Sequence, residues 1–200
     1  MIAIVNYGLG NLHSVQKAAA YVGGAAVVTD DAQMILGADK VILPGVGAFA
    51  DGMKGLESRG LVPVVREFAA LGKPLMGICL GMQLLFEESE EQGQHQGLGL
   101  LTGSVVLFQP LSVKVPQIGW NQVEVSKSSG LMNGIQDGDY FYFNHGYYCI
   151  PEDAGDVLTL TDYGTQFASS VERGTIYGVQ FHPEKSQKTG LQILKNFVEL

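Results

Sequence analysis

Short apolar runs alternate with segments of helical spacing through the first half of the chain. The runs predict buried strands at residues 2–6, 25–29, 40–44 and 74–78. Apolar positions that recur every three to four residues predict helices after Asn11, at 31–37, at 53–71 with a break near Gly60 and Pro63, and at 80–86. Strands that alternate with helices of this length form parallel βαβ units. This half therefore predicts a mostly parallel central sheet with helices on both faces.

The pattern changes after Glu91. A polar, glycine-rich stretch at 92–99 predicts a loop, and the runs beyond it predict strands at 102–108, 118–125, 140–148, 157–161, 166–172 and 175–181. Asp137-Gly138 and Arg173-Gly174 predict tight turns, and apolar spacing predicts a last helix at 189–200. We therefore expect an α/β fold with antiparallel strands in the C-terminal half, built as a single domain over residues 1–200.

The composition indicates a compact soluble protein. Of its 200 residues 46% are hydrophobic, and the formal net charge is −8 at pH 7. A negative chain without clustered Lys and Arg is not expected to bind nucleic acid or an anionic membrane. The N-terminus lacks the positive region of a signal peptide and no apolar stretch is long enough to span a membrane, so we expect a cytoplasmic location. Two distant cysteines and the lack of metal-ligand spacings predict no disulfide, metal or cofactor.

Cys79 lies at the junction of a predicted strand and a predicted helix, between Gly77 and Gly81. This spacing is that of a nucleophile elbow with cysteine in place of serine. The turn lifts the sulfur out of the sheet, and the free N–H groups of the helix start favour the thiolate. The alternative is a buried cysteine that acts only as a small apolar residue.

A second candidate is His182-Pro183-Glu184, directly after the predicted strand at 175–181. Residues i and i+2 of an extended chain point the same way, so the carboxylate of Glu184 can orient the imidazole of His182. Such a pair is the base and its orienting partner in a catalytic triad. Because ligand sites of open α/β sheets lie at the carboxyl ends of strands, we expect His182 near Cys79. The alternative is a capping histidine beside a solvated glutamate.

A third candidate is the loop at 44–49, again at a strand end. Gly45 and Gly47 allow the backbone to approach a ligand closely. A tetrahedral intermediate at the cysteine needs hydrogen-bond donors, and the N–H groups of Val46 and Leu80 are the natural pair. A plain turn is the alternative. His145 could compete with His182 as a base, but it lacks an adjacent acid, so we interpret it as part of the site wall.

In this order and spacing, the cysteine elbow, the loop at 44–49 and the His-Pro-Glu tripeptide resemble class I (triad) glutamine amidotransferase domains over nearly the whole chain. Residues 6–14 and 118–121 are more narrowly similar to the glutaminase subunits of imidazole glycerol phosphate synthases, from histidine biosynthesis. The resemblance implies a flavodoxin-like fold and hydrolysis of glutamine to glutamate and ammonia through a γ-glutamyl thioester. Two positions depart from that subfamily: Gly146 replaces a common hydroxyl residue, and Gln117 a common histidine.

The resemblance also implies the substrate and partner contacts. The amino-acid end of glutamine should be bound by Gln83 and Glu91, aided by the backbone around Gly146 and Tyr147. Ammonia should pass to a (β/α)₈-barrel cyclase subunit, which makes imidazole glycerol phosphate and an aminoimidazole carboxamide ribotide. The residues expected at the interface with that subunit are Asn11, Trp120, Tyr142 and Lys185.

Three other functions would fit the same residues. A γ-glutamyl peptidase would use the triad on peptides without a partner. The glutaminase of pyridoxal phosphate synthase would serve another synthase, although the segment Ile118-Gly119-Trp120-Asn121 favours the histidine pathway. A binding module without enzymatic activity would leave Cys79 unreactive toward an electrophile that mimics glutamine.

Overall fold

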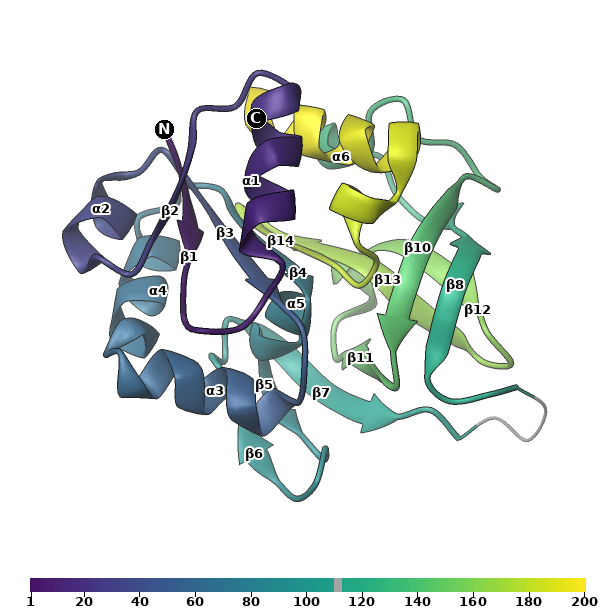
Figure 1. Cartoon of the computed structure of the whole chain (residues 1–200). Coiled ribbons are helices and arrows are strands. Elements are labelled where there is room, and N and C mark those ends of the chain that lie inside the picture. Colours follow the sequence, from purple (N-terminus) through teal and green to yellow (C-terminus); the bar gives the residue numbers. More distant parts are fainter. Residues whose placement is uncertain (110–112) are drawn as a thin grey trace.

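The computed structural model describes residues 1–109 and 113–200. Within these residues an eight-stranded sheet forms the centre of the molecule (Figure 1). Its strands, in order across the sheet, are β2 (Ala26–Thr29), β1 (Ile2–Val5), β3 (Lys40–Gly45), β4 (Leu75–Cys79), β14 (Ile176–Val179), β13 (Gln166–Arg173), β12 (Val157–Asp162) and β9 (Glu124–Val125). The pairings from β2 to β14 are parallel, whereas those from β14 to β9 are antiparallel. The predicted α/β sheet with an antiparallel C-terminal part is confirmed.

Helices cover both faces of this sheet, as predicted. On β1, Ile2 and Ile4 join an apolar cluster with α1 (Leu12–Tyr21) and α6 (Gln187–Glu199). The alternate residues Ala3 and Val5 join a cluster with the other helices, α2 (Ala32–Gly37), α3 (Phe49–Ser58), α4 (Leu61–Ala70) and α5 (Leu80–Leu84). The two faces follow from the period-two alternation of a strand. Figure 1 shows α1 beside α6, away from α2 and α4.

Two smaller sheets flank the C-terminal half. β8 (Gln117–Gln122) pairs with β10 (Tyr140–His145). The other sheet is formed, in order, by β11 (Tyr147–Pro151), β7 (Leu101–Leu107), β5 (Phe86–Ser89) and β6 (His95–Gln96). Short 3₁₀ helices complete the described chain: η1 (Gly130–Met132), η2 (Ala154–Asp156) and η3 (Pro183–Lys185).

Several predicted boundaries were wrong. The helix expected at 80–86 ends at Leu84, and Phe86 begins strand β5, which pairs with β7. The strand expected at 140–148 is divided at Gly146 into β10 and β11, which belong to different sheets. The strand expected at 118–125 is divided into β8 and β9, and the loop expected at 92–99 contains β6. Asn11 precedes α1, but its side chain makes no capping hydrogen bond.

The topology brings three strand ends together. β3, β4 and β14 are adjacent and parallel, so their carboxyl ends lie at one edge of the sheet. Gly45 pairs with Cys79, and Ile78 pairs with Val179, three residues before His182. This edge is where an open α/β sheet holds its ligands. In the described part of the chain, no helix combines the length and apolar character that crossing a bilayer requires.

Candidate active site

Cys79 occupies the sharp turn between β4 and α5. Its backbone torsions are φ 54° and ψ −111°, and the residue is 4% exposed. A Cβ on Gly81 would lie 1.7 Å from the Leu43 carbonyl oxygen, and a Cβ on Gly77 would lie 2.6 Å from the Gly81 carbonyl. Both positions therefore require glycine because strand and helix approach so closely. The strained non-glycine residue between them matches the geometry of a nucleophile elbow.

His182 and Glu184 lie beyond the end of β14. His182 Nδ1 is 2.9 Å from Glu184 Oε1, and both side chains are buried. His182 is extended, but Pro183 begins η3, so Glu184 reaches the imidazole from a 3₁₀ turn. The expected pairing is present, although the reason for it differs from the extended geometry that the sequence suggested.

The environment of His182 favours its protonated form. Burial lowers the pKa of the imidazole, but the nearby Cys79 sulfur and the Glu184 carboxylate outweigh burial and raise the pKa to about 10. His182 Nε2 is buried and meets no described residue in hydrogen-bond geometry, although the Cys79 sulfur lies near enough to raise the pKa of the imidazole. An imidazolium beside a sulfur and a carboxylate can donate a proton to a leaving group.

The loop after β3 forms one wall of a cavity of about 210 Å³. Of the site residues expected from the sequence, those that line it are Val46, Gly47, Cys79, Leu80, Gln83, Glu91, Gly146 and Tyr147. His145 also lines it, as expected of a wall residue, together with Asn144 and Pro116. Gly45 is buried beneath the loop, where a Cβ would lie 2.3 Å from Tyr7 Oη.

Two polar side chains of this cavity have defined orientations. Gln83 Nε2 donates to the Tyr147 carbonyl at 3.0 Å and to Gln180 Oε1 at 3.1 Å. Both amide hydrogens are thus used, and within residues 1–109 and 113–200 no donor bonds Gln83 Oε1. Glu91 Oε2 accepts from the Phe49 N–H, at the start of α3, at 2.7 Å. Burial raises the pKa of Glu91, whereas the bond from Phe49 opposes the rise.

Three contacts of this site were not anticipated from the sequence. Gln180 Nε2 lies 3.7 Å from Cys79 Sγ, and the Asn144 carbonyl oxygen lies 3.8 Å from the same sulfur. Tyr7 donates its hydroxyl hydrogen to the Pro44 carbonyl at 2.6 Å and so anchors the start of the loop. In the sequence, these residues belong to strands or turns without a functional signal. Their contacts with the site become visible only once distant segments pair in the fold.

Three of the expected interface residues cluster beside His182. The ring centroids of Trp120 and Tyr142 are 6.1 Å apart, and Lys185 Nζ lies 5.6 Å from the Tyr142 centroid. The Tyr142 and His182 rings are 6.4 Å apart, so the cluster continues to the buried imidazole. Asn11 lies at the start of α1, which contacts the turn η3 that carries Lys185.

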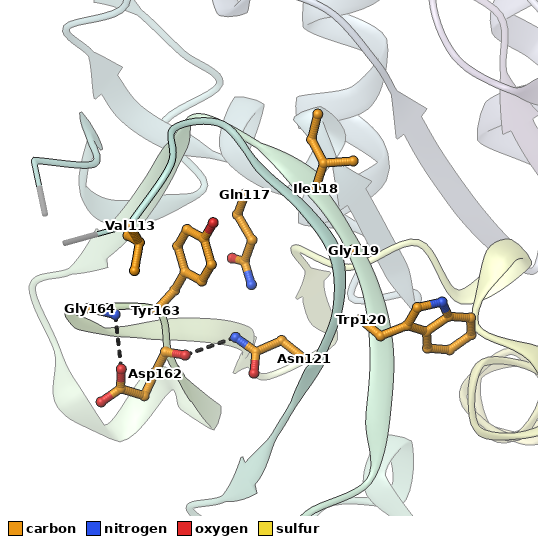
Figure 2. A pocket seen from close by; sticks show the side chains of 9 residues that line it. All are labelled: Val113, Gln117, Ile118, Gly119, Trp120, Asn121, Asp162, Tyr163 and Gly164. Atoms are coloured by element: carbon orange, nitrogen blue, oxygen red, sulfur yellow. Dashed lines mark hydrogen bonds between the residues drawn. The ribbon is translucent and has the colours of Figure 1, made fainter.

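A larger cavity, of about 370 Å³, lies elsewhere along β8. Figure 2 shows Gln117 and Tyr163 directed toward it, while the indole of Trp120 points away. None of the three strand ends described above lines this cavity, so size alone does not identify the site. Within residues 1–109 and 113–200, no group of three or more His, Cys, Asp or Glu side chains is placed to hold a metal ion.

The chain is similar to known proteins along its whole length. Residues 3–200 match the family model described as "Glutamine amidotransferase class-I". The chain is 53% identical over 195 residues to the imidazole glycerol phosphate synthase subunit HisH of Aquifex aeolicus, covering 97% of this chain and 94% of the relative. It is 54% identical over 199 residues to the HisH subunit of Moorella thermoacetica, covering 100% of this chain and 94% of the relative.

Solved structures share the fold at low sequence identity. A crystal structure of a glutamine amidotransferase superposes with a TM-score of 0.77 at 19% identity and covers 100% of this chain and 99% of its own. The structure of PurLQS from Thermotoga maritima superposes with a TM-score of 0.74 at 19% identity, covering 99% and 97%. These structures support the fold alone, whereas the sequence matches define the family. The chain belongs to the class-I glutamine amidotransferase family and, within it, to the HisH subunits of imidazole glycerol phosphate synthase.

Proposed function

We propose that this chain hydrolyses glutamine to glutamate and ammonia, with Cys79 as nucleophile, His182 as general acid and base, and Glu184 as the carboxylate that orients the imidazole. The observation that carries the proposal is the meeting of β4 and β14 at one sheet edge, with the His182–Glu184 contact of 2.9 Å behind the Cys79 turn. A nucleophile, a base and an orienting acid in this relation form a triad.

The reaction takes two steps. The Cys79 thiolate attacks the side-chain carboxamide carbon of glutamine, and the N–H groups of Val46 and Leu80 hold the resulting oxyanion, with Gly45 and Gly47 allowing the close approach of the loop. Protonated His182 gives its proton to the departing ammonia, which leaves a γ-glutamyl thioester. His182 then takes a proton from water, the hydroxide attacks the thioester, and glutamate leaves as the thiolate is restored.

The cavity supplies contacts for the amino-acid end of the substrate. Gln83 lines the cavity, and its Oε1, which has no hydrogen-bond partner among the described residues, is the proposed acceptor for the α-ammonium group. Glu91, in the same wall, adds a carboxylate for that group. The backbone around Gly146 and Tyr147 completes this end of the site.

The partner is a (β/α)₈-barrel cyclase subunit, which uses the ammonia to form imidazole glycerol phosphate and aminoimidazole carboxamide ribotide. Two HisH relatives, each named as a subunit of imidazole glycerol phosphate synthase, support this proposal. Ammonia loses its lone pair when water protonates it, so the partner must dock over the site. The proposed docking surface consists of exposed Trp120 and Lys185, half-buried Tyr142 between them, and half-buried Asn11.

The test replaces Cys79 by alanine and uses Cys149→Ala as the matched control, because Cys149 is buried outside the cavity. We expect Cys79→Ala to release no glutamate while it still co-purifies with the cyclase subunit, and Cys149→Ala to retain turnover. Normal glutamate release by Cys79→Ala would remove the nucleophile assignment. If the wild-type chain failed to bind the cyclase subunit, the proposed partner would be wrong.

A further inference from the structure

The Cys79 sulfur contacts two groups outside the proposed triad. The Asn144 carbonyl oxygen can only accept a hydrogen bond, so at 3.8 Å it suits the thiol S–H. The Gln180 amide nitrogen can only donate, so at 3.7 Å it suits a sulfur lone pair. Ionisation removes the proton that the carbonyl accepts, but it strengthens the bond from the amide, because a donor facing an anion makes a charge-assisted bond. Of these two contacts, only the one with Gln180 favours the thiolate.

The orientation of the Gln180 amide is fixed by its neighbours. Gln180 Oε1 accepts from Gln83 Nε2 at 3.1 Å, which turns the Gln180 nitrogen toward the sulfur. Gln83 is fixed in turn, because its nitrogen also donates to the Tyr147 carbonyl at 3.0 Å. A flipped Gln83 would place its oxygen against two acceptor oxygens. The chain of bonds from the Tyr147 carbonyl to the sulfur therefore has only one favourable direction.

The Tyr147 carbonyl, at the other end of this series of hydrogen bonds, is also fixed in position. His145 Nδ1 lies 2.7 Å from the same Tyr147 carbonyl. Burial lowers the pKa of His145 to about 4, so the imidazole is neutral near pH 7 and Nδ1 must carry its hydrogen to bond a carbonyl. Two donors thus converge on the Tyr147 carbonyl. Gln180 is fully buried, so its amide keeps this position without competition from solvent.

We propose that Gln180 is a positioning residue for glutamine hydrolysis, which donates a hydrogen bond to the ionised Cys79 sulfur and links it through Gln83 to the substrate cavity. The proposal rests on the proposed function, since it assumes that Cys79 is the nucleophile. A substrate that binds Gln83 Oε1 would restrict the motion of the Gln83 and Gln180 side chains, which are hydrogen-bonded to each other. The nucleophile would then be most firmly held when glutamine is bound.

The titratable groups around the Cys79 sulfur determine what a pH profile of its alkylation would report. His182 faces it from the end of β14, with Glu184 behind, and His145 faces His182 from β10. Tyr7 lies on the β1 side, and burial raises the pKa of its phenol. Cys149, on β11, is fully buried, and burial raises the pKa of its thiol. Both stay neutral over the pH range of the test, so the profile reports on Cys79 and His182.

The experiment follows alkylation of Cys79 by iodoacetamide in the full chain, measured by peptide mass spectrometry from about pH 6 to about pH 9. Gln180→Met keeps similar volume but removes the donor. We expect the pH of half-maximal alkylation to rise by about one unit, and glutamate release at neutral pH to fall roughly tenfold. The control is Asn196→Leu, which removes a buried structural amide that bonds the Leu131 and Asn133 carbonyls. It should lose stability without a shift in the profile.

A second measurement needs no substitution at Gln180. In nitrogen-labelled wild-type protein, the side-chain NH₂ resonances of Gln180 should titrate with Cys79, and they should stop titrating in Cys79→Ala. Two results would overturn the inference. One is a folded Gln180→Met variant with the wild-type pH profile of alkylation, and the other is Gln180 NH₂ resonances that do not change as Cys79 ionises. Those results differ from failure of the proposed function, in which wild-type Cys79 itself would be dispensable for glutamate release.

Discussion

At the scale of the residue, the site holds buried groups whose charge states are set by opposing causes. His182 is pushed toward its neutral form by burial and toward its charged form, more strongly, by a sulfur and a carboxylate. His145, in the cavity wall, lies among Phe108, Phe143 and Phe167, and burial is the largest influence on its pKa. The two imidazoles therefore have opposite protonation at neutral pH, which suits one to proton transfer and the other to holding a carbonyl.

The neutral state of His145 predicts a loss of stability in acid. Its pKa falls from 6.5 to about 4 in the folded chain. Between these values the unfolded chain binds more protons, so the free energy of unfolding rises with pH in this window and falls as acid is added. The contribution is roughly 3 kcal/mol over the full window. Urea unfolding at several pH values should show a shallower acid slope for His145→Asn than for wild type.

The control for this prediction is His13→Asn, since His13 lies exposed on α1. Its acid slope should match that of wild type. If His145→Asn retained the full wild-type slope, the assignment of the acid sensitivity to His145 would be wrong.

Gln180 marks the limit of sequence reasoning at this scale. Cys79, His182 and Glu184 carry local signals, a glycine spacing and a His-Pro-Glu tripeptide, that predict their proximity. Gln180 carries none, because it is one polar residue near the end of an apolar run, and its partner lies 101 positions away. Only the pairing of β14 with β4 brings the two together.

At the scale of the element, the junction of β4 and α5 depends on contact with β3. Gly81 lies against the Leu43 carbonyl of that strand, and Gly77 lies against the first turn of α5. The glycine spacing predicted this junction correctly. The end of α5 was not predictable in the same way, because a short apolar run fits a helix or a strand equally well. Phe86 joins β5 only because Leu101 of β7 lies beside it.

Gly81→Ala should therefore be strongly destabilising. Its Cβ would lie 1.7 Å from a backbone oxygen, which no rotamer change can relieve. We expect the free energy of unfolding to fall by about 3 kcal/mol, the upper end of the usual cost of overpacking, because the central strands must separate. Gly37→Ala, at the end of α2 with nothing within 4 Å, is the matched control and should change stability by less than about 1 kcal/mol. Equal effects in chemical denaturation would contradict this account of the junction.

At the scale of the whole molecule, the order of strands brings the candidate site residues together. The neighbouring strands β3, β4 and β14 begin at Lys40, Leu75 and Ile176, far apart in the sequence. All three end at the same edge of the sheet. The alternation of strands and helices predicted the parallel sheet, and the preference of ligands for strand ends led us to expect the candidate site at this edge. The separate β8–β10 sheet could not be anticipated, because the break at Gly146 interrupts what reads as one continuous strand.

The proposed hydrolysis requires Cys79 and His182 to act together on glutamine. The most direct measurement is labelling by an electrophile that mimics glutamine, with the site and rate of modification followed by peptide mass spectrometry in wild type and His182→Ala. We expect modification of Cys79 and not of Cys149, at a rate that falls at least about 100-fold without the imidazole. Modification of Cys149, or an unchanged rate at Cys79 in His182→Ala, would contradict this expectation.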